Sequence, residues 1–337
     1  MRPLKSRILY LKGMHGMGDN FHERAFVSQY LKEYSEVYLE TSWPALFWDL
    51  VPQGLRLIFK DSNLRTQEKN ARREADLFYK GPIPPQNMCE VKQIWYRAKD
   101  IREAGSVLGA MGACLERPVG DGDFRFPLKD EWEERYSREI LPQLDTGGRP
   151  ILVYRPLVER TEWSGCNARN PDHDIYRTVY RYLRDTKKFY VVSVADIEPG
   201  KEWIVGNEGL QPADIEFHEG NLPVEMLATL VSHADMTLNA PGFMTIMSQS
   251  VGTPNVTVFG GYENSQSFSV GAKWAPYLGI DPTNSCQCFM HHHACDKRID
   301  IPLALKRLER FTDEAASARQ IRPIRRPHVA DGFQGVA

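Results

Sequence analysis

Short apolar runs alternate with amphipathic helical stretches along most of the chain. Near the N-terminus, the β-prone run 7–12 is followed by a glycine-rich turn at 13–19. Apolar residues then recur at three- and four-residue spacing from Phe21 to Leu31, and a second β-prone run covers 37–41. Strand, glycine-rich turn, helix and strand in this order predict the repeating unit of a parallel, doubly wound α/β sheet.

The rest of the chain continues this alternation. Further strands are expected at 57–59, 93–96, 150–154, 189–194, 215–217, 236–238 and 255–261. Helices are expected at 101–115, 129–140, 175–183, 223–232, 243–251 and 301–318. The glycine pair Gly147-Gly148 directly precedes a clear new strand, as turn residues between structural units do. The pattern therefore predicts two α/β domains, 1–148 and 149–320, followed by a tail at 321–337.

The charge is nearly balanced, with 42 lysines and arginines against 44 aspartates and glutamates. A protein that binds nucleic acid usually presents a concentrated basic surface. Here only the C-terminal tail, with Arg319, Arg322, Arg325 and Arg326, is basic, and a solvated chain end is the simpler explanation of it. The sequence thus gives no strong nucleic-acid signal.

Neither a membrane span nor a secretory signal is expected. No stretch approaches the ~20 apolar residues that a membrane-spanning helix needs. The apolar run 8–11 behind the basic N-terminus is shorter than the roughly 7–15 residues of a signal-peptide core. We therefore expect a cytoplasmic protein without a transmembrane segment, with peripheral membrane contact left open.

Three of the six cysteines lie close together in the pattern Cys286-x-Cys288-x6-Cys295, with histidines between them. Thiols and imidazoles are ligands of zinc, which makes Cys286, Cys288, His291 and Cys295 a candidate zinc set. The one-residue gap between the first two cysteines is shorter than the ~2–4 residues usual in structural zinc sites. The alternative is a compact loop of reduced thiols beside exposed histidines.

Three turns are placed where a parallel α/β sheet binds its ligands, beyond the carboxyl ends of the strands: 13–19, 239–245 and 259–261. The first of them lacks the third glycine of a dinucleotide fingerprint and the Gly-Lys-Ser/Thr of a phosphate-cradling loop. It carries instead Asp19, a carboxylate at the mouth of the turn. An aspartate at this position suits a helix N-cap or a general base, and the two roles are compatible.

Two stretches resemble the glycosyltransferase family 9 proteins, the heptosyltransferases of lipopolysaccharide assembly. Residues 8–20, with a strand followed by Gly-x-Gly-Asp, resemble the N-terminal signature of that family. Residues 222–260 resemble its donor site, with a helix, the turn Asn239-Ala240-Pro241-Gly242-Phe243, a small-residue helix, Gly-x-Pro and a strand ending in Phe-Gly. The resemblance implies a GT-B fold, in which two Rossmann-like domains face each other across a cleft. It places the acceptor on the first domain and the nucleotide-sugar on the second.

The resemblance also implies roles for individual residues. Asp19 would be the catalytic base. The acceptor-side turn would contain His15, Gly16, Met17, Gly18 and His22. The donor side would contain Arg155, Arg160, Arg169, Asn239, Pro241, Gly242, Phe243, Thr245 and Gly260. Among these, the arginines lie where the family places a phosphate-binding basic residue, and the amides of Gly242 and Phe243 could bind a pyrophosphate at a helix N-terminus.

The donor turn departs from the family pattern, because family members usually carry Asp-Thr-Gly followed shortly by a histidine. Here the corresponding stretch is 240–245, which has no carboxylate, and Thr245 stands about where the histidine would be. The sugar therefore stays open.

The expected activity is sugar transfer with inversion, from a nucleoside-diphosphate sugar to a glycan or lipid-linked glycan acceptor. We expect it to need no cofactor and no metal, as the resemblance to metal-independent GT-B transferases implies. Two alternatives are a transferase that uses another acceptor, such as a protein or a modified DNA base, and a non-catalytic relic that binds nucleotide-sugars.

Overall fold

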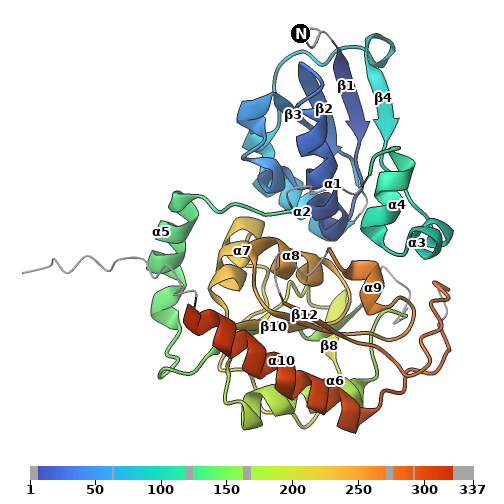
Figure 1. The fold of residues 1–337 in the computed structure, drawn as a ribbon. Helices are drawn as coiled ribbons and strands as arrows, with labels where there is room; N and C mark the ends of the chain where they lie inside the picture. Colours follow the sequence, from blue (N-terminus) through green and yellow to red (C-terminus); the bar gives the residue numbers. More distant parts are fainter. Residues whose placement is uncertain are drawn as a thin grey trace, which may run out of the picture.

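The computed structural model describes residues 7–62, 64–118, 124–161, 168–270, 276–290 and 293–321. Figure 1 shows two α/β domains, with the N-terminal one (blue) above the C-terminal one (green to red). Each is built around a parallel sheet, so the predicted fold class is confirmed. Every strand pair within these two sheets is parallel because helical crossovers connect the strands, as the sequence pattern predicts.

The N-terminal sheet has four strands in the order β3-β2-β1-β4. Its strands are β1 (Ile8–Lys12), β2 (Glu36–Thr41), β3 (Leu55–Phe59) and β4 (Glu90–Gln93). Its helices are α1 (Met17–Tyr30), α2 (Arg65–Arg73), α3 (Ala98–Ala104) and α4 (Val107–Cys114). The one helix expected at 101–115 is two helices, because Gly105 ends α3 in the left-handed conformation at φ 77°.

The C-terminal sheet has six strands in the order β12-β11-β10-β5-β7-β9. These strands are β5 (Ile151–Tyr154), β7 (Tyr190–Val194), β9 (Ile215–Phe217), β10 (Met236–Asn239), β11 (Asn255–Val258) and β12 (Tyr277–Ile280). The helices of this half are α6 (His173–Arg181), α7 (Val224–His233), α8 (Phe243–Val251), α9 (Ser265–Phe268) and α10 (Ile301–Ile321). A separate antiparallel pair, β6 (Leu157–Arg160) and β8 (Glu202–Val205), was not foreseen in the sequence.

The last helix packs on the C-terminal domain. The sequence left open whether α10 packs back on the N-terminal domain, and Figure 1 shows it beside α6, on the face of the C-terminal sheet that points away from that domain. Ala304, Leu308 and Phe311 are buried in one cluster with side chains of α6. Their spacing puts them on one side of the helix, which matches the apolar outer face of the sheet.

Helix α5 (Asp130–Glu139) precedes the expected domain boundary, yet it packs against α7 of the C-terminal half. The Tyr136 ring stacks on His233 at 4.5 Å, and Glu133 accepts a hydrogen bond from the same imidazole at 2.6 Å. Arg135 adds an ion pair to Glu225 at 3.4 Å. The segment from 124 to 148 therefore covers part of the second domain in this structure (Figure 1).

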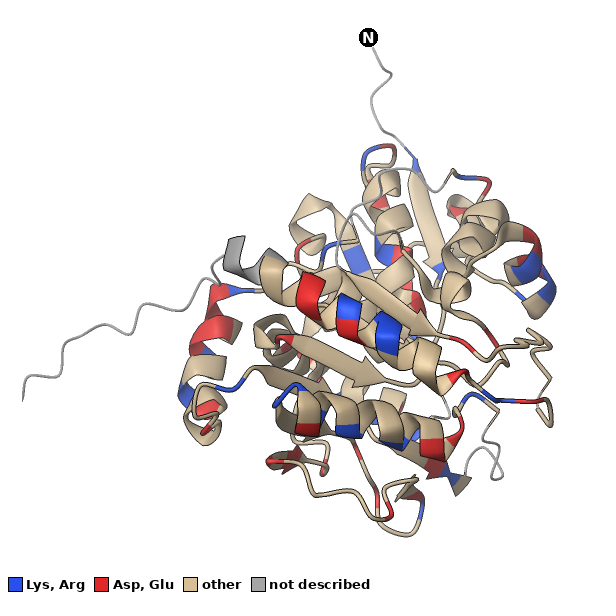
Figure 2. Ribbon diagram, turned by 60° about the horizontal axis from the view of Figure 1, so that its bottom comes forward, with Lys and Arg blue, Asp and Glu red and all other residues tan. Residues whose placement is uncertain are grey.

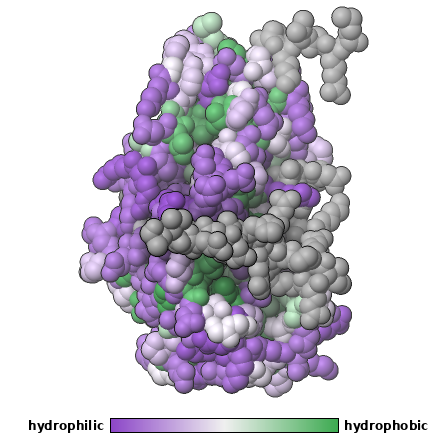
Figure 3. Space-filling model, turned by 90° about the vertical axis from the view of Figure 1, so that its left-hand side faces the viewer, coloured by the Kyte–Doolittle hydropathy of each residue, from purple (hydrophilic) through white to green (hydrophobic). Residues whose placement is uncertain are grey.

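The surface agrees with the balanced composition. Figure 2 shows basic and acidic residues interspersed over the described helices and loops. The side shown in Figure 3 is mostly hydrophilic, and its hydrophobic residues form patches separated by hydrophilic ones. Among the described residues, no helix combines the length and the apolar character needed to cross a membrane. The basic tail residues Arg322, Arg325 and Arg326 lie outside the described residues.

Candidate functional site

A cavity of about 620 Å³ lies between the two domains, where the carboxyl ends of their strands face each other. The turn after β1 forms one wall and the turn between β10 and α8 forms the opposite wall. These walls come close together: a Cβ on Gly18 would lie 3.3 Å from the Phe243 Cα. The cavity therefore brings two of the three predicted turns into one site.

Asp19 stands on the first-domain wall, in the first turn of α1. The N-cap of this helix is Gly16, so Asp19 is not the cap that its position in the sequence also allowed. A Cβ on Gly16 would lie 2.5 Å from Asp19 Oδ2, so a larger residue there would make the carboxylate move. The Tyr96 hydroxyl donates a hydrogen bond of 2.6 Å to Asp19 Oδ1.

Burial raises the pKa of Asp19, and the Tyr96 hydrogen bond and the positive charge of Arg169 oppose that rise. A carboxylate with a raised pKa is a better proton acceptor than a fully solvated one. Tyr96 binds Oδ1, whereas Oδ2 has no hydrogen-bond partner among the described residues. The arrangement suits a base that is held in one orientation.

The other residues of this turn also line the cavity, in different environments. His15 is exposed, and its carbonyl accepts a hydrogen bond of 2.8 Å from the Trp43 indole. His22 is only 2% exposed and packs edge-on against Phe124, so burial lowers its pKa to about 4. His22 is therefore a neutral residue in the wall of the cavity.

On the opposite wall, the cationic side chain of Arg155 lies beside Phe243, the first residue of α8. The Arg155 guanidinium lies over the Phe243 ring, 4.7 Å from its centroid. Burial and the neighbouring charge of Arg160 lower the pKa of Arg155 to about 10, which still keeps it charged at neutral pH. Among the described residues, none forms a hydrogen bond or an ion pair with this guanidinium. Gly242 and Phe243 begin α8, whose first N–H groups have no partners within the helix.

Two expected donor-binding side chains do not reach the cavity. Asn239 and Thr245 are 0% exposed, and the Asn239 amide donates to the Thr245 hydroxyl at 2.8 Å. Thr257 and Asn255 of β11 complete this buried network, which holds the turn 239–245 from inside the C-terminal domain. The expectation of direct donor contact is corrected for both residues, because each polar group is already paired inside the domain.

Gly260, like Asn239 and Thr245, supports the wall of the cavity without lining it. A Cβ there would meet the Asn170 carbonyl oxygen at 2.6 Å, so only glycine lets the 168–170 segment approach β11. That segment carries Arg169, which lines the cavity and pairs with Glu263 at 3.0 Å. Glu263 is buried, and the facing guanidinium limits the rise in its pKa.

Sequence reasoning missed Tyr96 and Glu263. We expected a strand at 93–96, but β4 ends at Gln93, so Tyr96 lies in the turn beyond it. Glu263 follows the predicted strand end at 259–261, and the rule that ligands lie beyond such ends could have identified it. Both residues hold groups that the sequence did indicate, Asp19 and Arg169.

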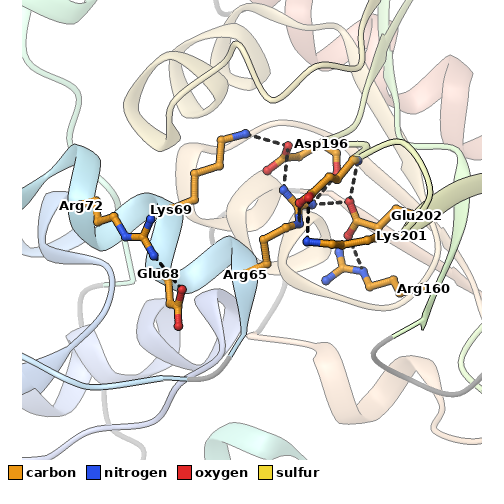
Figure 4. Close-up of polar contacts among 9 residues, drawn as sticks. Arg65, Glu68, Lys69, Arg72, Arg160, Asp196, Lys201 and Glu202 are labelled. Atoms are coloured by element: carbon orange, nitrogen blue, oxygen red, sulfur yellow. Dashed lines mark hydrogen bonds and ion pairs between the residues drawn. The ribbon is translucent and has the colours of Figure 1, made fainter.

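A second polar cluster links the domains at another edge of the cavity (Figure 4). Arg65 of α2 forms ion pairs with Asp196, Glu198 and Glu202 of the C-terminal domain. Lys69 pairs with Asp196 at 2.9 Å. Arg160, a predicted donor-side residue, lines the cavity and also pairs with the buried Glu202 of this cluster at 3.1 Å.

The candidate zinc set is only partly described. His291 lies outside the described residues, whereas Cys286, Cys288 and Cys295 are described and lie close to His293.

No protein-family model matches the sequence, and no curated protein matches it. The fold, in contrast, is similar to solved glycosyltransferases. A glycosyltransferase family 9 protein from Veillonella parvula is 14% identical, with a TM-score of 0.57 over 92% of this chain and 98% of that chain. Heptosyltransferase II of Escherichia coli is 10% identical, with a TM-score of 0.53 over 92% of this chain and 99% of that chain.

The iron-containing dodecameric glycosyltransferase TibC of enterotoxigenic E. coli is also similar. It is 14% identical, with a TM-score of 0.57 over 94% of this chain and 77% of that chain. A second TibC structure, in complex with ADP-D-β-D-heptose, is 13% identical, with a TM-score of 0.53. The resemblance seen in the sequence is therefore confirmed at the level of fold: this chain has the GT-B fold of the family 9 glycosyltransferases.

Proposed function

We propose that this protein transfers a sugar from a nucleoside-diphosphate sugar to an acceptor hydroxyl, with inversion at the anomeric carbon. The observation that carries the proposal is the cavity, in which a held carboxylate faces a cation and a helix N-terminus. A transferase of this kind needs a base for the acceptor on one side and positive potential for the leaving diphosphate on the other.

In the proposed reaction, Asp19 Oδ2 accepts the proton of the acceptor hydroxyl as its oxygen attacks the anomeric carbon. The bond from that carbon to the diphosphate oxygen breaks at the same time, and the nucleoside diphosphate leaves. Arg155 and the first amides of α8 stabilise the charge that develops on the diphosphate. We propose that no metal is needed at this step, because these groups already supply the compensating charge.

The donor turn 239–245 lacks the aspartate and histidine side chains of the family pattern, so it would contact the sugar differently. Asn239 and Thr245 are paired inside the domain, so the turn presents mainly backbone to the cavity. The nucleotide is therefore the part of the donor that these walls are best equipped to hold. We choose ADP as the first probe because the TibC structure contains an ADP-sugar, with UDP and GDP beside it.

Thermal-shift and transfer assays test the proposal together. A nucleoside diphosphate at a hundred times its Kd adds about 2.7 kcal/mol of stability. Asp19→Asn should keep this shift but lower transfer by about 10²–10⁴-fold, because it loses the base and keeps the diphosphate contacts. Arg155→Gln should lose the shift.

The exposed Asp76→Asn serves as the control, because Asp76 pairs only with Lys80 on the surface of the first domain. Full transfer by Asp19→Asn would remove the base assignment. A nucleotide shift without turnover on any acceptor would favour the binding-only alternative. The absence of any nucleotide shift would refute the donor site.

A further inference from the structure

Four potential metal ligands meet in the loop between β12 and α10, along the right-hand side of Figure 1. The ligand atoms of Cys286, Cys288, His293 and Cys295 all lie within 4.8 Å of one another. Cys286 Sγ is 3.1 Å from His293 Nε2. Three thiols and one imidazole around a common point are the Cys₃His set of closed tetrahedral zinc sites. We propose that this cluster binds one thiophilic metal ion, for which Zn²⁺ is the best match.

The backbone around Cys288 supports the proposal independently. Gln287 and Phe289, on either side of it, have left-handed φ angles of 47° and 53°. Non-glycine residues pay conformational energy for this region, and such strain persists only where other interactions impose it. The strained turn directs Cys288 to the other ligands, and the Met290 amide donates to Cys288 Sγ at 3.5 Å. Bonds to a shared ion would impose this conformation.

His293 fits the same account. Its side chain is buried, with Nε2 toward Cys286, whereas Nδ1 has no partner among the described residues. Burying an imidazole among thiols costs solvation energy that a metal–nitrogen bond would recover. The sequence had indicated His291 as the fourth ligand, but that residue lies outside the described residues, and His293 is the described histidine beside the three thiols.

The proposed ion would brace one wall of the cavity rather than take part in transfer. The Gly261 carbonyl accepts a hydrogen bond from the Gln287 amide at 2.9 Å, next to Cys286 and Cys288 in the chain. The Phe289 amide donates to the Tyr262 carbonyl at 3.3 Å, and the two rings lie 5.4 Å apart. Tyr262 and Phe289 both line the cavity. Metal binding would thus fix the loop that also holds Glu263 against Arg169.

Metal analysis tests the proposal without an activity assay. The full chain is purified with a tag that binds no metal, under reducing conditions, and its metals are measured by mass spectrometry. We expect about one zinc ion per chain, released stoichiometrically by a mercurial reagent that titrates thiols. Cobalt substitution should give the visible bands of tetrahedral thiolate coordination.

Cys288→Ser and Cys295→Ser should lower the bound zinc at least about tenfold. Cys114→Ser, which changes an exposed thiol of the first domain, should keep it. If the serine variants fail to fold, the metal content of the wild-type chain and its cobalt spectrum still show whether the cluster binds an ion. Stoichiometric iron would keep the site and overturn the zinc assignment. A reduced wild-type chain that neither contains nor takes up an ion, or cysteines joined in a disulfide, would overturn the proposal.

Discussion

Replacing Gly260 by alanine should disturb the cavity through the backbone that carries Arg169. The new Cβ would lie 2.6 Å from the Asn170 oxygen and 3.1 Å from its carbonyl carbon. Both are backbone atoms, so no side-chain rotation relieves the clash. An ordinary contact begins at 3.4 Å, which means that the 168–170 segment must move by about 0.8 Å.

This displacement has two measurable costs. Overpacking of a well-packed region lowers the free energy of unfolding by about 1–3 kcal/mol. The moved segment also shifts Arg169 and its ion pair with Glu263 in the wall of the cavity, and a misplacement of ~1 Å costs on the order of 10²-fold in rate. Because Arg169 is one of the arginines expected on the donor side, nucleotide binding should weaken by about tenfold.

Urea unfolding and calorimetric titration with the nucleoside diphosphate measure the two costs. Gly147→Ala is the matched control, because φ is 56° there and no atom lies within 4 Å of the added Cβ. Its left-handed strain should cost about 1–2 kcal/mol without moving the cavity. If Gly260→Ala bound nucleotide as tightly as Gly147→Ala at equal stability, the steric reasoning would be wrong.

Three further predictions concern stability, measured by chemical unfolding. Arg65→Ala should cost about 1.5–3 kcal/mol because it leaves charged partners across the domain interface, whereas Arg72→Ala, on the same helix but 80% exposed, should change little. The pKa of His22 falls from 6.5 to about 4 on folding. As the pH falls from 6.5 to 4, the free energy of unfolding of the wild-type chain should therefore drop by up to about 3 kcal/mol relative to that of His22→Leu. The same pH dependence of unfolding in both proteins would contradict this. Burial raises the pKa of Glu74 from 4.5 to about 7, so its contribution to the free energy of unfolding should be lost as the pH rises from about 4.5 to 7. Glu74→Gln should remove that loss, and a variant with the same pH dependence as the wild-type chain would disprove it.

The sequence by itself determined the order of elements and the turns that bear chemistry. Hydrophobic periodicity is a local property, and it predicted β1, β2, β5 and α8 close to their observed bounds. The rule that ligands lie beyond parallel strands then selected the turns around Asp19 and Gly242, and both line the cavity. These predictions succeed because each depends on neighbours in the chain.

Only the tertiary structure decided which selected residues face the ligand and which support it. Asn239 and Thr245 stand in a turn that the sequence marks for binding, but their hydrogen bonds run to Thr257, on the next strand of the sheet. Tyr96 and Glu263 reach Asp19 and Arg169 across long sequence separations that periodicity does not encode. A side chain's role depends on the partner that satisfies its polar atoms, and here that partner comes from another strand or from a loop far away along the chain.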